Sequence, residues 1–370
     1  MKIKRFYKTK IESLSQWDDV LEVFAKEERK ISYQKEIVYP VPKWIYRGQG
    51  DINWRFNSSF ERNIKRSWGS VSSEAALKII ESQMMEYFKK HVQTYVDIKK
   101  LSPIEILSMM QHYEIPTRLV DFSENAYVAL FHAVYGRKED NLNNDFTVLS
   151  IRQDWLMGME VFNDEKTNET ERYFSGLYND EQEKEKSLKE GNHILCPLKY
   201  EGIRDKDDSS ILCIYPENRN QRLEAQSGLF LMPKKLSETF ENQLFDIVGD
   251  ESKEWQEKNI EELLNGKIDD VAGIMFIFSK ELVHTVKMKL LLCNITHSKL
   301  FPDVSGLAQE VKELFSNKVI KEMDSGPDKP KLKLTLCLPV LTYDLFMKDR
   351  TENDYTKEEL SILKETLNEN

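Results

Sequence analysis

The chain has 370 residues, 40% of them hydrophobic and 31% charged, with a formal net charge of -10 at pH 7. This composition is typical of a globular protein that buries a core. The acidic balance argues against non-specific DNA binding, which depends on neutralising phosphates, but it leaves room for a local basic cleft. No apolar run reaches membrane-spanning length, and the N-terminal residues lack the apolar run of a signal peptide. We therefore expect a cytoplasmic protein without membrane contact.

The first part of the chain is predicted to be mainly helical. Apolar residues recur at helical spacing, and capping residues precede several of these runs. An aromatic-rich strand is expected at 44–47, and turns are expected between residues 54 and 62. The expected helices span residues 16–28, 73–96, 104–113 and 124–135.

From residue 146 onward the pattern favours strands. The stretch 163–191 is dominated by charged and amide residues, which indicates an exposed insertion. The order of elements predicts an α+β fold with a mixed or antiparallel sheet core and flanking helices. The expected strands span 146–151, 193–198, 210–215, 228–232, 271–278 and 331–336, and the expected helices span 281–292, 306–315 and 358–367.

The most informative stretch runs from Gln111 to Phe122. Pro116 forces Ile115 out of the helical region, so the preceding helix must end there. Polar side chains at a helix exit can be held rigidly against a pocket. The stretch therefore predicts part of a binding site.

Two further stretches carry similar signals. Arg47 lies at the end of a short strand, beside Gly48 and Gly50, and offers a planar cationic fork suited to phosphate. Farther on, polar residues around Glu224 and Gln226 run directly into an apolar strand. If these residues are part of that strand, the two side chains share one face.

Structural alternatives remain for these residues. Arg118 and Asp121 are expected to pair with each other and brace the loop. His112 could be a satisfied core histidine, and Arg47 a surface salt-bridge residue. The histidines and the four cysteines show no metal-ligand spacing, so no metal site is expected. No GxGxxG or Walker-type loop is present, which argues against a Rossmann or P-loop nucleotide site.

Together these motifs resemble the FRG domain family, named for a Phe/Tyr-Arg-Gly motif, here Tyr46-Arg47-Gly48. The stretch from Gln111 to Phe122 is similar to the family's second signature, with Glu114 where Gly is usual and Val120 where Leu is usual. Later stretches, 226–230 and 300–307, also resemble family motifs. The resemblance covers about residues 10 to 316. It implies an FRG-type domain at 1–316, with a charged insertion near 160–192, and a C-terminal extension at 317–370.

The Tyr-Arg-Gly strand is also similar to the first motif of arginine-type ADP-ribosyltransferases. That likeness implies an ADP-ribosyltransferase-like fold with NAD as substrate. Arg47 would grip NAD, Thr117 or Ser123 would stand in the middle motif, and Gln226 with Glu224 would occupy the last motif. In that family the catalytic Glu follows its partner by two residues. Here the order is reversed, so Asp121 or another acid is an alternative carboxylate.

The resemblance implies an NAD- or nucleotide-binding enzyme, either a transferase or an NAD glycohydrolase. FRG domains occur in bacterial proteins, some of them suspected to act in phage defence. The competing hypothesis is a module that binds a nucleotide or a protein segment without chemistry. The expected catalytic residues are Arg47, Glu224 and Gln226, and the expected nucleotide-binding residues are Tyr46, Gly48, Gln49, Gln111, His112, Tyr113, Thr117, Arg118 and Asp121.

Overall fold

A computed structural model describes ten stretches of the chain, separated by gaps. It divides into two units, residues 1–287 and 288–370, which are considered separately. The expected insertion at 163–191 and the elements expected at 331–336 and 358–367 lie outside the described residues. The described stretches are 5–35, 44–68, 73–98, 101–138, 141–153, 193–195, 211–216, 220–248, 252–268 and 270–314.

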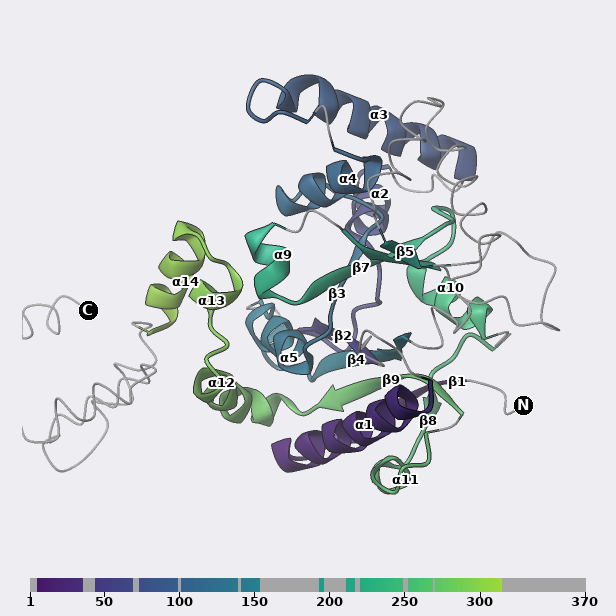
Figure 1. Ribbon diagram of the computed structural model, residues 1–370, viewed down its shortest axis with the longest axis vertical. Coiled ribbons are helices and arrows are strands. Elements are labelled where there is room, and N and C mark those ends of the chain that lie inside the picture. The colour runs from purple at the N-terminus through teal and green to yellow at the C-terminus, as the bar shows by residue number, and fades with distance from the viewer. Residues whose placement is uncertain are drawn as a thin grey trace, which may run out of the picture. The chain divides into compact units, whose positions relative to one another are not determined.

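The first unit is built on one mixed β-sheet with the strand order β5-β6-β7-β3-β2-β4-β9-β1-β8 (Figure 1). β1 runs parallel to its neighbours β9 and β8, and the other pairs are antiparallel. The strands are β1 (Arg5–Ile11), β2 (Trp44–Gln49), β3 (Val120–Ser123), β4 (Phe146–Arg152), β5 (His193–Leu195), β6 (Ile211–Tyr215), β7 (Gly228–Pro233), β8 (Gln256–Glu257) and β9 (Val271–Phe278).

Helices flank this sheet, so the expected α+β fold with a mixed sheet is confirmed. Among the described helices, none combines the length and apolar character needed to cross a membrane. The described helices of both units, in chain order, are α1 (Leu14–Lys35), α2 (Ser59–Trp68), α3 (Glu74–Val92), α4 (Pro103–His112), α5 (Ala126–Tyr135), α9 (Gln221–Ala225), α10 (Phe240–Ile247), α11 (Ile260–Leu264), α12 (Val283–Leu292), α13 (His297–Leu300) and α14 (Val304–Leu314), with a 3-10 turn at Lys280–Leu282.

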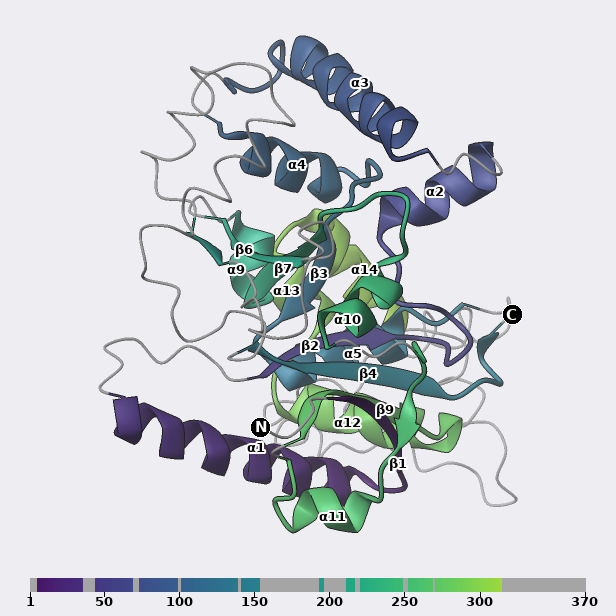
Figure 2. The same ribbon diagram turned by 90° about the vertical axis from the view of Figure 1, so that its right-hand side faces the viewer.

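The sheet opens between β2 and β3. These two strands share the single bridge Tyr46–Ser123, whereas β2 pairs with β4 from Trp44 to Gln49 and β3 pairs with β7 along its whole length. Figure 2 shows β3 rising away from β2 towards α4. Because β2 and β3 share only this bridge, backbone groups and side chains of both strands face the space between them. The candidate site lies in this space.

Gly48 fixes the position of α5 against β2. A Cβ at Gly48 would lie 1.8 Å from the carbonyl oxygen of Ala129 and 2.7 Å from the backbone nitrogen of Ala133. Only glycine tolerates such close backbone approach. The glycine of the Tyr46-Arg47-Gly48 motif therefore serves helix–strand packing, and it holds Arg47 in register with α5.

The second unit contains a compact pair of helices, α13 and α14. The backbone nitrogen of Ser298 donates to Glu310 Oε2 at 2.7 Å, and Gly306 lies against the carbonyl oxygen of Phe301. The first contact holds the start of α13 against the middle of α14, and the second holds the end of α13 against the start of α14.

Several elements differ from the sequence predictions. The residues expected to form turns between 54 and 62 include the start of α2, and the expected helix at 124–135 begins only at Ala126, where Asn125 caps it. The residues around Glu224 form the short helix α9, capped by Asn220, and not a strand. β1 was not predicted.

Candidate functional site

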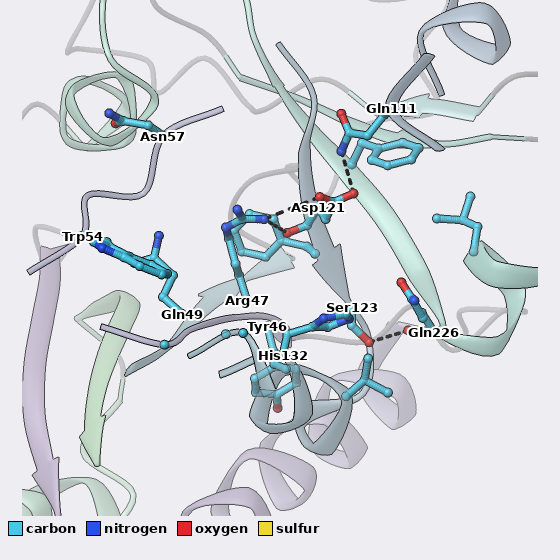
Figure 3. Close-up of a pocket in the computed structure, with 18 of the residues that line it drawn as sticks. Tyr46, Arg47, Gln49, Trp54, Asn57, Gln111, Asp121, Ser123, His132 and Gln226 are labelled. Atoms are coloured by element: carbon cyan, nitrogen blue, oxygen red, sulfur yellow. Dashed lines mark hydrogen bonds and ion pairs between the residues drawn. The ribbon is translucent and has the colours of Figure 1, made fainter. Parts of the chain in front are cut away.

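A cavity of about 870 Å³ lies where β2 and β3 diverge. Its walls come from β2, the loop after it, the end of α4, β3, α5 and α9 (Figure 3). Ligand pockets in proteins have volumes of roughly 300 to 1,000 Å³, so the cavity is large enough for a nucleotide. All three stretches singled out in the sequence contribute to it.

Arg47 projects into this cavity from β2. Its Nη1 donates to the carbonyl oxygen of Asp121 at 2.7 Å and lies 3.8 Å from Asp121 Oδ2. The Arg47 side chain is only 15% exposed. Burial lowers the pKa of its guanidinium, and the carboxylate of Asp121 opposes that shift. Arg47 Nε is buried and has no hydrogen-bond partner among the described residues.

Asp121 is held in place by the end of α4. Gln111 Nε2 donates to Asp121 Oδ1 at 2.6 Å, and the hydroxyl of Thr117 donates to Gln111 Oε1. Thr117 is fully buried. α4 ends at His112, before Pro116, and β3 begins at Val120, so this relay connects the helix exit to the strand and aims the Asp121 carboxylate at the cavity.

The cavity is basic although the whole protein is acidic. Arg47, Arg55, Arg62, Lys138 and Arg222 line it, against the single carboxylate Asp121 among the described lining residues. Positive charge at low-dielectric walls raises the local concentration of anions. The arrangement is suited to an anionic ligand such as a phosphate ester.

Two buried amides and an indole line the cavity near Arg47. Gln49 is 6% exposed and Asn57 is 7% exposed, and Gln49 Oε1 and Asn57 Oδ1 both lack a hydrogen-bond partner among the described residues. Trp54, in the loop between them, is 40% exposed. Buried polar atoms are almost always satisfied in proteins, so these acceptors are places where a bound molecule or water can donate.

The structure brings most of the residues predicted for the site to one place. Tyr113, Thr117, Arg118 and Glu224 are not among the described residues that line the cavity. Thr117 acts through Gln111, and Tyr113 is 59% exposed at the end of α4. The predicted residues that do line it are Tyr46, Arg47, Gly48, Gln49, Gln111, His112, Asp121 and Gln226.

The expected ion pair between Arg118 and Asp121 is wrong. The carboxylate that neutralises Arg118 belongs to Glu81 of α3, which accepts from Nε at 2.7 Å and also from Nη2. Nη1 of Arg118 donates to the carbonyl oxygen of Lys234 at 3.1 Å. Arg118 is fully buried, so it ties α3 to the chain after β7, away from the cavity.

The expected placement of Glu224 and Gln226 on one strand face is also wrong. Glu224 lies in the last turn of α9 with an exposed side chain, and Gln226 caps that helix. Of the two, only Gln226 lines the cavity. Its carbonyl oxygen accepts from the hydroxyl of Ser123 at 2.7 Å, which fastens the end of α9 to β3 (Figure 3).

Some lining residues were not predicted. Arg55 and Asn57 were placed in a turn-rich stretch with no periodic signal, and His132 was placed on a buried apolar helix. The alternation of rings and polar groups from Trp54 to Arg62 was the only available signal. Arg222 stands in the third predicted stretch but was given no role there. The lining residues missed from the sequence include Trp54, Arg55, Asn57, Arg62, His132 and Lys138.

Metal ligands are not gathered in this region. Within the stretches that the structure describes, no group of three or more His, Cys, Asp or Glu side chains is arranged to hold a metal ion.

Comparison with known families agrees with the motifs in this cavity. A family model described as FRG domain matches residues 42–142, which include both Tyr46-Arg47-Gly48 and the stretch from Gln111 to Phe122. This part of the chain is therefore similar to an FRG domain, and it supplies β2, α4, β3 and α5 to the site. Neither the comparison with curated proteins nor the comparison with solved structures gave a match.

Proposed function

We propose that the cavity between β2 and β3 binds NAD or a related nucleotide, with Arg47 holding its phosphates. The observation that carries this proposal is the gathering of five basic side chains around one carboxylate in a chain with a net charge of -10. A guanidinium matches the geometry of phosphate oxygens. Arg47 Nε, buried without a partner among the described residues, is a donor that a phosphate oxygen would satisfy.

Other lining residues have separate roles in this proposal. Arg62 and Arg222 add positive charge around the phosphates, and Gln226 offers an amide to a ribose hydroxyl. The ring of His112 faces the cavity from the end of α4. Tyr46 is 6% exposed and packs edge-on against Trp17, so it supports the wall and does not stack on the ligand.

The same arrangement supports ADP-ribosyltransferase-like chemistry. In that reaction the bond between nicotinamide and ribose breaks, nicotinamide leaves with the electron pair, and water or a macromolecular nucleophile attacks the ribose carbon and loses a proton. A carboxylate stabilises the positive charge that develops on the ribose. We assign this role to Asp121, because it lines the cavity and Gln111 orients it, whereas Glu224 is exposed and is not among the lining residues.

A binding module without chemistry is the second candidate. It is favoured by the contacts of Asp121, whose carboxylate already accepts from Gln111 and lies 3.8 Å from the Arg47 guanidinium. A carboxylate neutralised in this way has less charge to offer a transition state. In this version the cavity holds the nucleotide, and Asp121 serves only to aim Arg47.

Nicotinamide release and calorimetry separate the two candidates. The purified protein is incubated with NAD, free nicotinamide is quantified, and NAD binding is measured by titration. Release that is lost in Asp121→Asn but retained in Glu86→Gln, a control at an exposed carboxylate of α3, supports the enzyme. Saturable binding without release supports the module. Absence of both overturns the proposal.

A role in phage defence follows if the protein consumes NAD, as the family resemblance implies. Expression in a bacterial host would then deplete NAD and stop growth. Growth that is restored by Asp121→Asn, at equal protein levels, would support an effector of this kind. Toxicity that persists in Asp121→Asn would separate growth arrest from the chemistry proposed for this cavity.

A further inference from the structure

One side of the cavity carries a group of residues suited to an aromatic ring with a hydrogen-bond donor. Gln49, Trp54 and Asn57 lie on the side of Arg47 that faces away from Asp121 (Figure 3). Gln49 ends β2, and the other two belong to the loop that follows. We call these three residues the Trp54 group.

Gln49 presents an acceptor whose orientation is fixed. Its Nε2 donates to the carbonyl oxygen of Arg55 at 3.1 Å. If the Gln49 amide were rotated by 180°, its oxygen would face the carbonyl oxygen of Arg55. The hydrogen bond therefore fixes which side-chain atom is the nitrogen and which is the oxygen. Gln49 Oε1 is buried and has no partner among the described residues. The side chain therefore offers the cavity an acceptor at Oε1.

Asn57 and Trp54 complete the group. Asn57 Oδ1 is a second buried acceptor without a partner in the described part of the chain. The whole residue is only 7% exposed. Trp54 is 40% exposed, which leaves ring surface open to a ligand. Aromatic side chains bind nucleobases by stacking, regardless of base identity. The acceptors supply the selectivity that stacking lacks.

We infer that the Trp54 group recognises the adenine of the nucleotide, with the 6-amino group donating to Gln49 Oε1. This inference rests on the proposed function and adds the direction in which the dinucleotide lies. A primary amine satisfies an acceptor, whereas a ring carbonyl would face it oxygen to oxygen and leave it unsatisfied. Adenine fits this requirement, and hypoxanthine does not.

Charge fixes the direction of the dinucleotide. Arg47 stands between the Trp54 group and Asp121 (Figure 3), and it is the guanidinium proposed to hold the pyrophosphate. If the pyrophosphate is bound there, one nucleoside lies towards Trp54 and the other towards Asp121 and Gln226. The carboxylate must face the nicotinamide ribose for cleavage, so the adenosine takes the Trp54 side.

Titration with matched dinucleotides tests this placement without altering the protein. NAD, deamino-NAD (hypoxanthine in place of adenine) and nicotinic acid adenine dinucleotide (a carboxylate in place of the carboxamide) are each titrated into the full-length protein. We expect deamino-NAD to bind about 10-fold or more weakly than NAD, because a buried acceptor loses its donor.

Two variants localise the effect. Gln49→Met keeps the length of the side chain and removes the acceptor, and it also removes the hydrogen bond to the carbonyl oxygen of Arg55. We expect the preference for NAD over deamino-NAD to fall towards one. Trp54→Ala should weaken both ligands by about 10-fold. Tyr87→Ala, at a 70% exposed ring on α3, is the matched control and should change neither affinity.

The outcomes distinguish this inference from the proposed function. Equal binding of NAD and deamino-NAD overturns the adenine assignment and leaves nucleotide binding intact. Discrimination against nicotinic acid adenine dinucleotide alone, lost in Gln49→Met, would put the nicotinamide at the Trp54 group and reverse the direction. Failure of all three dinucleotides to bind rejects the proposed function itself, and the inference with it.

Discussion

Arg47 on β2 and Arg118 before β3 are both withdrawn from water, yet they are partnered very differently. Arg118 uses Nε and Nη2 on the Glu81 carboxylate and Nη1 on a backbone carbonyl. Arg47 meets Asp121 through Nη1 alone, and its Nε has no partner among the described residues. A guanidinium satisfied by the protein supports the fold, whereas one left partly unsatisfied at a cavity is available to a ligand.

The carboxylate partners extend this contrast. The Glu81 side chain is 10% exposed, whereas that of Asp121 is 64% exposed. Removing Arg118 would take both guanidinium hydrogen bonds from a buried carboxylate, but removing Arg47 would leave a carboxylate that water can solvate. The comparison therefore predicts opposite consequences for the same substitution at the two arginines.

The largest expected effect is on stability, at Arg118. Arg118→Met should destabilise the protein by about 3–5 kcal/mol, because the buried Glu81 carboxylate loses both hydrogen bonds from the guanidinium. Urea unfolding of the wild type and the variant measures the difference. The double variant Glu81→Met with Arg118→Met should recover much of the loss, since no buried charge remains. A single variant as stable as the wild type would contradict the structural role of this pair.

Gly48→Ala should have the next largest effect. The added Cβ would collide with the backbone of α5, and overpacking of this kind costs about 1–3 kcal/mol. Because the collision pushes α5 and β2 apart next to Arg47, ligand affinity should fall together with stability. Thermal unfolding and NAD titration on the same sample check both. Unchanged unfolding would show that α5 does not pack on β2 as described.

A smaller effect is expected from acid at Glu74, in the first turn of the helix that carries Glu81. Burial raises the pKa of Glu74, but hydrogen bonds from Ser237 and Leu236 and the charge of Lys78 outweigh it and place the pKa below its ordinary value of 4.5. A carboxyl with a lowered folded pKa stabilises the protein above its ordinary pKa, and this contribution is lost as pH falls through the folded pKa.

The difference in stability between wild type and Glu74→Gln should therefore be full near neutral pH and shrink below about pH 4.5. Urea unfolding across that range measures it, with Glu86→Gln on the exposed side of α3 as control. A difference that is independent of pH would show that the Glu74 charge does not anchor this helix to the chain after β7.

The smallest predicted effect is a gain of stability beside the cavity. Glu114 follows α4 with φ 61, a left-handed conformation that favours glycine, which is the residue usual here in the family motif. Glu114→Gly should stabilise the protein by about 1 kcal/mol. Glu114→Ala keeps the strain and is the control. Equal unfolding midpoints for the Gly and Ala variants would contradict the strain.

The sequence was sufficient for elements set by local signals. Pro116 ended α4 as predicted, and Ser102 and Asn125 cap helices that the periodicity indicated. β1 was missed because its lysines mask its apolar residues, and its partner β9 lies about 267 residues away in sequence. The five residues of α9, which include Glu224, are too few for residue spacing to distinguish a helix from a strand. The Asn220 side chain caps the segment and makes it a helix.

The site was accessible from the sequence only where residues stand in a motif. Arg47, Gln111 and Asp121 were proposed because rigid elements precede or follow them. Trp54 and Asn57 lie in the loop after β2, where no periodic pattern places a side chain, and the Arg55 carbonyl in that loop accepts from Gln49. The sequence prediction paired Arg118 with Asp121, the nearest acidic residue in the sequence. Its actual partner is Glu81, which lies 37 residues earlier in α3. Such long-range choices depend on packing.

Titration of NAD into the wild type and Arg47→Met tests the central claim most directly. Arg66→Met, at an exposed arginine of α2, is the matched control, and thermal unfolding of all three proteins is recorded alongside. We predict that Arg47→Met weakens NAD binding by about 10-fold or more while its unfolding temperature stays at or above that of the wild type. Equal affinity of the wild type and Arg47→Met would contradict the account.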